Sequence, residues 1–438
     1  MTANRRNFLK QAAVLTGAFS ATSLFNQAHA ADWANAAKRI ANLTPLQAAQ
    51  DEDYWSVIQR GYTANTNIII LNNGGVSPAP IVVQDAVDRY NRLLNQGPSY
   101  YMWKILDQGR EPLRDKLAEL AGCDPEELAI NRNATEALNN IILGLPLQKG
   151  DEVLGAKQDY PHMMVAYKQR AQREGIVYKQ LDFKFPIEND EEIVKAYADA
   201  ITPKTKLIHV THIVNWVGQI MPVRKIADMA HARGIEVICD GAHSFGLLDY
   251  KIPDLHCDYW GTSLHKFLSA PVGSGMMWIK KDKIAKVWPL LTDDIPDSPN
   301  IRKFENLGTR SFAIEQGIGE AVNFQNSIGN KRKEERVRYL KNYWAERVQN
   351  IPRVKLQTSL KADYSCGICG VAIDGMPVEQ LTTTLFNKYK IHTTAMVTDN
   401  VNCVRVTPHV YTTLPDLDKM VRAIEEIAAN KVTIAVKR

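Results

Sequence analysis

Cysteine, net charge and long apolar runs are all scarce in this sequence. Its 438 residues include six cysteines and carry a formal net charge of +5, three units of which belong to Arg5, Arg6 and Lys10. Six cysteines in so long a chain exclude a small disulfide-stabilised scaffold. The small remaining charge gives no support to a nucleic-acid partner. No segment is long and apolar enough to span a bilayer.

The chain is also free of internal repeats, low-complexity tracts and Gly/Ser-rich linkers. Apolar residues make up 45% of it and charged residues 23%, which is the composition of an ordinary globular protein with a buried core. At roughly 100 to 200 residues per domain, the length predicts two or three domains.

The N-terminus has the pattern of an export signal. Residues 4–10 read Asn-Arg-Arg-Asn-Phe-Leu-Lys, a mildly apolar and uncharged stretch follows over residues 12–25, and residues 28–30 read Ala-His-Ala. The apolar stretch is shorter than the roughly 20 residues that span a bilayer, so we expect no stable membrane insertion. We predict a twin-arginine signal peptide over residues 1–30, read by the twin-arginine export machinery and cleaved after Ala30, and a periplasmic mature protein. An amphipathic N-terminal helix or an anchor is the alternative.

A strand–helix–strand unit is predicted in the middle of the chain. Residues 207–211 form a short apolar run, a pattern of helical period follows Pro222, Gly234 ends it, and residues 235–239 are rich in β-formers. Such a unit belongs to a parallel sheet with a right-handed crossover. Ligands bind beyond the carboxyl ends of the strands in such sheets, and Asp240 occupies that position.

A helix is predicted to begin at Asn133. This residue can cap the helix, Glu136 can complete a capping box, and apolar periodicity continues through Leu143. The first N–H groups of such a helix are unpaired donors that can bind phosphate. An ordinary capped helix explains the same pattern, so the phosphate interpretation depends on a second motif.

That second motif is an aspartate and a lysine at the ends of two neighbouring segments. Residues 239–243 read Cys-Asp-Gly-Ala-His and residues 261–266 read Gly-Thr-Ser-Leu-His-Lys, so Lys266 follows Asp240 by 26 residues. Together with Gly-Ser-Gly at residues 273–275, this pairing resembles the cofactor signature of class V aminotransferases. These are fold type I enzymes that use pyridoxal 5′-phosphate (PLP).

The resemblance covers most of the mature chain. Within the class, the sequence looks similar to the isopenicillin N epimerase-like branch. It implies an α/β fold with a large PLP-binding domain over residues 76–310, built on a mainly parallel seven-stranded sheet between helices. A smaller α+β domain would cover residues 311–438, and residues 31–75 would pack on it. The resemblance also implies a homodimer with active sites at the interface.

The resemblance assigns roles to residues that PLP chemistry requires. Lys266 would form the internal aldimine with the cofactor and then move the Cα proton. Asp240 would keep the pyridine nitrogen protonated. Tyr160 would stack on the ring, Arg405 would bind the substrate carboxylate as a planar fork, and Thr309 would contact the phosphate of a neighbouring subunit.

Six further positions are expected around the cofactor because they match the family's motifs. Two would lie near its O3′ atom and ring edge, Asn215 and His243. Four would hold its phosphate through side chains or backbone N–H groups: Ser263, His265, Ala134 and Thr135.

The activity implied is cleavage of the Cα–H bond of an amino acid or a peptide-borne amino group, giving transamination or epimerisation. The second base of an epimerase is left open among Tyr100, Tyr101, Tyr160 and His162. Residues 391–402, where cysteine desulfurases present a sulfur-accepting cysteine, contain none. Two alternatives remain: a siderophore-tailoring oxidative decarboxylase or deaminase, because an exported relative of similar build modifies pyoverdine, and a catalytically inactive PLP-fold binding protein.

Two other patterns have simple structural interpretations. The charged run over residues 331–336 is predicted to be a solvent-exposed helix face. Cys366 and Cys369 form a single C-x-x-C, which is a weak metal signal, so either a short disulfide formed after export or two free thiols is expected. No His, Cys and carboxylate cluster has zinc spacing, and we predict no metal site.

Overall fold

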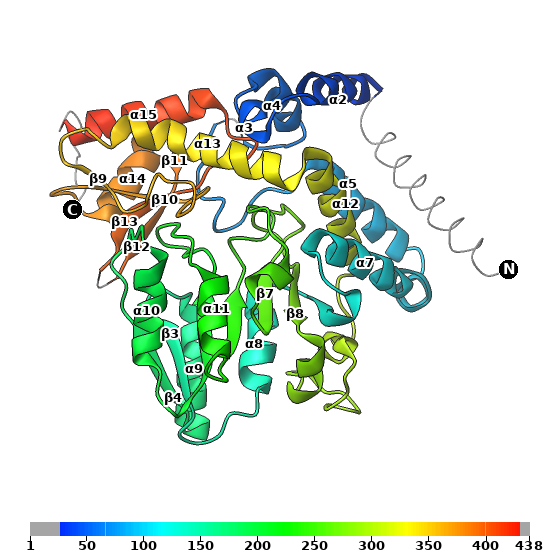
Figure 1. The fold of residues 1–438 in the computed structure, drawn as a ribbon. Helices are drawn as coiled ribbons and strands as arrows, with labels where there is room; N and C mark the ends of the chain where they lie inside the picture. The colour runs from blue at the N-terminus through cyan, green and yellow to red at the C-terminus, as the bar shows by residue number, and fades with distance from the viewer. Residues whose placement is uncertain (1–26, 66, 399, 430–438) are drawn as a thin grey trace, which may run out of the picture.

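The computed structural model describes residues 27–65, 67–398 and 400–429, in a larger and a smaller layered part (Figure 1). The twin-arginine motif and the apolar stretch of the predicted signal peptide lie outside the described residues. Residues 28–30 lie near the start of helix α2 (Gln27–Ile40). Among the helices of the described ranges, none is long and apolar enough to cross a membrane.

The larger part is built on a mainly parallel seven-stranded sheet, as the resemblance implied. The strand order is β2-β8-β7-β6-β5-β3-β4, and all neighbouring pairs except those made by β8 are parallel. The strands are β2 (Leu128–Asn131), β3 (Glu152–Ala156), β4 (Val177–Leu181), β5 (Thr205–Thr211), β6 (Glu236–Asp240), β7 (Tyr259–Ser263) and β8 (Gly275–Ile279).

Helices pack on both faces of this sheet, which explains why its strands are apolar on both sides. Leu207 and Ile238 share a core with helices α8 (Ala134–Gly144) and α9 (Pro161–Glu174). Ile208, which follows Leu207, and Val237, which precedes Ile238, belong to the core on the other face. The helices of the larger part are α5 (Ile81–Leu94), α6 (Pro98–Tyr100), α7 (Arg110–Ala121), α8 (Ala134–Gly144), α9 (Pro161–Glu174), α10 (Asp190–Ala200), α11 (Val223–His231) and α12 (Phe312–Ile328).

The predicted strand–helix–strand unit is confirmed. Strands β5 and β6 are parallel neighbours and α11 connects them. Gly234 lies in the turn after α11 with a φ of +70°, a left-handed conformation that glycine adopts without steric cost. Asp240 is the last residue of β6, so it stands at the carboxyl edge of the sheet.

The smaller part is a four-stranded antiparallel sheet with helices packed on it. The order is β12-β13-β10-β9, and the two-stranded pair β1–β11 joins the N-terminal segment to this part. The strands are β1 (Ile69–Ile70), β9 (Val354–Leu356), β10 (Cys369–Ile373), β11 (Ile391–His392), β12 (Thr394–Val397) and β13 (Asn402–Val406). The remaining helices are α3 (Pro45–Ala48), α4 (Glu52–Gln59), α13 (Asn330–Val348), α14 (Val378–Tyr389) and α15 (Leu414–Ala428).

The charged run over residues 331–336 is not an exposed helix face, so that prediction was wrong. Within α13, Lys333 is 2% exposed and Arg336 0%. Lys333 Nζ donates to the carbonyl of Phe267, and Arg336 forms an ion pair with Glu52. The helix lies between the N-terminal segment and the larger part, so its charged side chains find partners in segments far away in the sequence.

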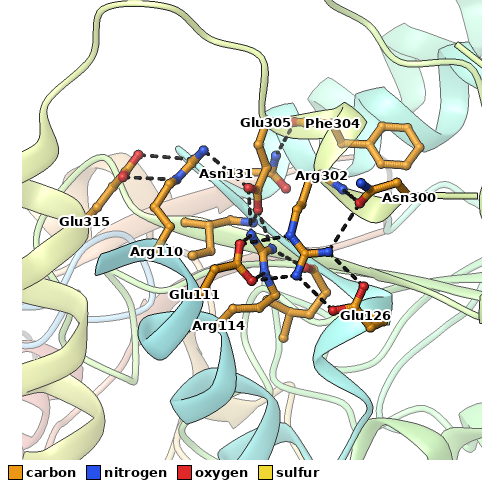
Figure 2. A network of polar contacts seen from close by, with 12 residues as sticks. Arg110, Glu111, Arg114, Glu126, Asn131, Asn300, Arg302, Phe304, Glu305 and Glu315 are labelled. Atoms are coloured by element: carbon orange, nitrogen blue, oxygen red, sulfur yellow. Dashed lines mark hydrogen bonds and ion pairs between the residues drawn. The ribbon is translucent and has the colours of Figure 1, made fainter. Parts of the chain in front are cut away.

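Another set of buried charges joins α7 to the 3₁₀ helix η6 (Ile301–Glu305) and to α12 (Figure 2). Arg114 Nη1 lies 2.6 Å from Glu305 Oε1, and the two side chains are 1% and 4% exposed. Arg110 pairs with Glu305 at 3.3 Å and with Glu315 at 3.2 Å. Glu305 also accepts the N–H of Ile130 in β2 at 2.6 Å. This network holds the segment before α12 against the sheet.

Candidate active site

A cavity of about 650 Å³ opens at the carboxyl ends of β5, β6 and β7, and residues of β12 and β13 close its other side. Its position is the one at which open α/β sheets bind ligands. Ten of the residues assigned to cofactor or substrate line it: Ala134, Thr135, Tyr160, Asn215, Asp240, His243, Ser263, His265, Lys266 and Arg405.

Asp240 faces this cavity from the end of β6 and is 3% exposed. Its Oδ1 atom accepts the N–H of Ala242 at 2.9 Å. Burial raises the pKa of the carboxyl group, and the electrostatic influence of His209 and Lys266 partly opposes this shift. A cationic ring N–H placed against the carboxylate would supply a counter-charge, so the position suits a protonated pyridine nitrogen.

Lys266 enters the cavity just after β7. Its Nζ atom lies 3.3 Å from His243 Nε2 and 5.9 Å from the centroid of the Tyr160 ring. Burial lowers the pKa of the ammonium group to about 8, although the Asp240 carboxylate acts in the opposite direction. The lowered pKa increases the neutral fraction of the amine near neutral pH, and the neutral amine is the form that can attack an aldehyde.

His243 lies beside this lysine and is buried. Its Nε2 atom is also 2.8 Å from the carbonyl oxygen of Gly74. Burial lowers the pKa of the imidazole, and the charges of Lys266 and Arg405 lower it further. His243 is therefore a neutral ring whose Nε2 atom lies near both the lysine amine and the Gly74 carbonyl oxygen.

The N-terminus of α8 is built as predicted, with one difference. Asn133 Oδ1 accepts the N–H of Glu136 at 2.9 Å, so Asn133 caps the helix. The Glu136 carboxylate does not complete the predicted capping box; it accepts the N–H of Arg132 at 2.7 Å and pairs with its guanidinium. Ser263 Oγ accepts the N–H of Ala134 at 2.9 Å. Ser263 and the first turn of α8 thus meet at one corner of the cavity, where a phosphate can be held.

Arg405 reaches the cavity from β13 and is 5% exposed. Its Nη1 donates to the carbonyl of Asn215 at 3.0 Å and its Nη2 to Asn72 Oδ1 at 2.9 Å. Burial lowers the pKa of the guanidinium to about 10. Within the described ranges no carboxylate forms an ion pair with it, so the group can bind a carboxylate from a ligand.

Two buried polar atoms without a partner belong to residues that line this cavity. Asn215 Oδ1 and Arg405 Nε make no hydrogen bond to the part of the chain that the structure describes. A buried polar atom left unpaired costs about 1–3 kcal/mol, and a ligand that pairs it removes this cost. Together with the Lys266 amine, the Asp240 carboxylate and the α8 N-terminus, these atoms fit a cofactor with an aldehyde, a ring nitrogen and a phosphate.

Thr309 does not line this cavity. It is exposed between η6 and α12. Its contact with a neighbouring subunit therefore stays a prediction. Tyr100, a candidate second base, is 59% exposed and lies outside the cavity, as do Tyr101 and His162, whereas Tyr160 lines it.

The cysteines are all free thiols in the structure, including Cys366 and Cys369. Burial raises the pKa of these two thiols to about 12 and about 11. Cys403, close to Arg405 in the sequence, is fully buried and does not line the cavity. In the described residues no group of three His, Cys, Asp or Glu side chains is placed to hold a metal ion.

Sequence reasoning missed the partner of Arg405 and one wall of the cavity. Asn72, which binds the guanidinium, is brought to it by a bridge between Asn72 and Thr407. Trp216 and three residues of β12 form the wall. Neither feature has a local sequence signal, because the segments that meet in space are separated by more than a hundred residues along the chain.

Comparison with known proteins decides the family. The family model described as Aminotransferase class-V matches residues 69–423. The chain belongs to the class V aminotransferase family. It is 26% identical to isopenicillin N epimerase of Amycolatopsis lactamdurans, across 85% of this chain and 98% of that protein. It is also 26% identical to a probable cysteine desulfurase of Halobacterium salinarum, across 84% of this chain and 94% of that protein.

Solved structures agree with this assignment at the level of the fold. A C-DES mutant with glycine covalently linked to its PLP cofactor superimposes with a TM-score of 0.76 at 20% identity, covering 84% of this chain and 99% of that one. The cysteine desulfurase of Thermococcus onnurineus gives 0.75 at 20% identity, covering 86% and 98%. This class V protein thus has the fold type I architecture and is a PLP-dependent enzyme.

Proposed function

We propose that this class V protein is an exported enzyme that acts at Cα of an amino acid or a peptide-borne amino group, as an aminotransferase or an epimerase. The observation that carries the proposal is the meeting of Lys266, Asp240 and Arg405 at one cavity. When bound, PLP supplies an electron-accepting ring that stabilises the negative charge left at Cα. The chain itself supplies an amine, a carboxylate and a guanidinium around that chemistry.

Each of these groups has a separate task. Arg405 binds the substrate carboxylate, and its bonds to Asn72 and the Asn215 carbonyl hold its planar fork in one orientation. Asp240 keeps a proton on the ring nitrogen. Lys266 carries a proton to or from Cα. The His243 ring beside it is neutral, so it adds no positive charge next to the lysine amine.

Transamination and epimerisation differ in where the proton returns. In transamination the proton would not return to Cα, the amino group would stay with the cofactor, and water would supply the carbonyl oxygen of the keto acid. In epimerisation the proton would return to the opposite face of Cα and give the epimer. Sulfur transfer of the desulfurase type has less support, because no cysteine of the described residues lines the cavity and burial raises the pKa of the Cys403 thiol to about 12.

We also propose a periplasmic homodimer. The signal-like residues 1–30 support export, and the exposed Thr309 supports a contact with a second subunit. N-terminal sequencing of protein from the periplasm should begin at Ala31, and light scattering of that protein should give twice the chain mass.

The central test is the cofactor link. Purified protein supplied with PLP should show the absorbance band of a lysine-bound cofactor, and borohydride reduction should fix the label on the peptide containing Lys266. Lys266→Ala should lose band and label, whereas the exposed Lys168→Ala should keep both. A wild-type protein that takes up no PLP would contradict the proposal.

The type of reaction is read in deuterated water. Deuterium at Cα with inverted configuration identifies an epimerase, and a keto acid with pyridoxamine phosphate identifies an aminotransferase. Release of carbon dioxide without either product would contradict both.

A further inference from the structure

The lining of the cavity also includes residues that have no assigned role in holding the cofactor. Arg405 and Lys266 fix where the carboxylate and the amine of a substrate must lie. Several lining residues that have no assigned role lie on the Arg405 side of the cavity or belong to the segments that close it: Val76, Trp216, Ala395, Met396, Val397 and Thr398. Because β12 is paired with the strand that carries Arg405, we infer that the third substituent of Cα faces these residues, which we call the wall.

Half of these six residues belong to strand β12, the edge strand of the smaller sheet. It is paired on one side with β13 in a register that places Thr394 opposite Arg405, so the wall begins beside the carboxylate-binding group. Successive side chains of a strand point to opposite faces. Since three consecutive residues, 395–397, all line the cavity, the cavity meets β12 along its edge.

The cavity has three charged groups, each already assigned to the cofactor or to the substrate carboxylate. They are Asp240, Lys266 and Arg405, and burial lowers the pKa of the imidazoles of His243 and His265, which keeps them neutral. In the ranges that the structure describes, the wall formed by Trp216 and β12 carries no ionisable side chain.

Resting on the proposed function, we propose that the substrate is an amino acid with an uncharged, largely apolar side chain, which lies against Trp216 and Met396 along β12. Trp216 is 7% exposed and offers an apolar surface. A carboxylate or ammonium group placed there would lose hydration without gaining a counter-ion, so dicarboxylic and dibasic amino acids are selected against.

The test uses pairs of amino acids with the same shape and different charge. PLP-loaded protein is titrated with L-leucine and L-aspartate, and with L-norleucine and L-ornithine, and binding is followed at equilibrium by the cofactor absorbance. The neutral member of each pair should bind at least about tenfold more tightly, which corresponds to about 1.4 kcal/mol.

Two variants check that β12 is responsible. Met396→Lys, and Val397→Lys at a side chain that is 55% exposed, place an ammonium group on the wall. Each should shift the leucine-to-aspartate preference toward aspartate by about tenfold. Leu46→Lys, at a side chain 59% exposed on α3, adds the same charge outside the cavity and should leave the preference unchanged.

Tight binding of aspartate or ornithine by the wild-type protein would overturn this inference, and so would PLP-loaded protein that binds none of the four. Those results leave the cofactor label on Lys266 in place. Loss of that label in the wild-type protein would instead overturn the proposed function.

Discussion

Two groups of buried charges in this molecule are arranged in opposite ways. In the network of Figure 2, Arg114 and Arg110 both face the Glu305 carboxylate, and Arg110 also pairs with Glu315. In the cavity, Asp240 and Arg405 are as deeply buried, yet neither forms an ion pair within the described residues.

The difference separates charges that hold the fold from charges that await a ligand. Desolvating a charge is costly, and the network offsets this cost inside the chain with opposite charges at short distance. The cavity leaves the cost in place, which shifts pKa values and keeps polar atoms available. In these two groups, pairing with an opposite charge accompanies a structural role, and the lack of such pairing within the described residues accompanies a binding site.

The largest expected effect comes from breaking the network. Glu305→Gln leaves Arg110 and Arg114 buried with too little negative charge, and should lower the free energy of unfolding by about 3–5 kcal/mol. Urea unfolding at pH 7 measures it. Glu379→Gln, at an exposed position on α14, removes the same charge without a buried partner and should be close to neutral. Equal effects of the two substitutions would contradict the comparison.

The same chemical change in the cavity should act in the opposite direction on stability. Because burial raises the pKa of Asp240, ionisation opposes folding at neutral pH. Asp240→Asn should stabilise the PLP-free protein, by less than the Glu305→Gln loss, and the gain should shrink as pH falls and the wild-type carboxyl protonates.

In the PLP-loaded protein Asp240→Asn should lower turnover by about 10²-fold or more, because a preorganised charge is lost. Thermal unfolding with and without PLP, together with turnover, measures both effects. If Asp240→Asn were less stable than the wild-type protein in the absence of PLP, the contrast between the cavity and the network would be refuted.

The lowered pKa of Lys266 predicts how the rate of PLP capture depends on pH. With a pKa of about 8, the Lys266 amine is largely neutral above pH 8. At pH 7 its neutral fraction is only about a tenth. The rate of covalent PLP capture, followed by stopped-flow absorbance, should rise from pH 6.5 and level off above about pH 8.5. A rate that keeps rising steeply to pH 10, as for free lysine, would show that burial does not tune this group.

The smallest effect is expected at the rim of the network. Arg302 and Glu126 are 2.8 Å apart, but their side chains are 31% and 51% exposed. Glu126→Gln should change the free energy of unfolding by less than about 1 kcal/mol, because water already screens this pair. Its effect should fall further in 1 M salt, whereas the loss in Glu305→Gln should persist.

Local patterns predicted the elements that position the site. The apolar runs around Gly234 gave β5, α11 and β6 in the right order, and Asn133 was identified as a helix cap. The charged run in α13 led to the wrong prediction of an exposed helix face. A pattern of charges on one helix does not show which other segments cover it. The predicted hydrogen bond of Glu136 was wrong by one residue. Its carboxylate accepts the N–H of Arg132, whose guanidinium also pairs with it, and not the N–H of Asn133.

The sequence by itself determined which chemistry is present: a lysine 26 residues after an aspartate, a capped helix upstream and an arginine near the end, in one family's order. The tertiary structure alone decided which charges are paired and what surrounds them. Asn72 meets Arg405 across 333 residues, and β12 turns its edge to the cavity. Caps and periodicity act over a few residues, whereas burial and ion pairing depend on whatever the folded chain brings alongside.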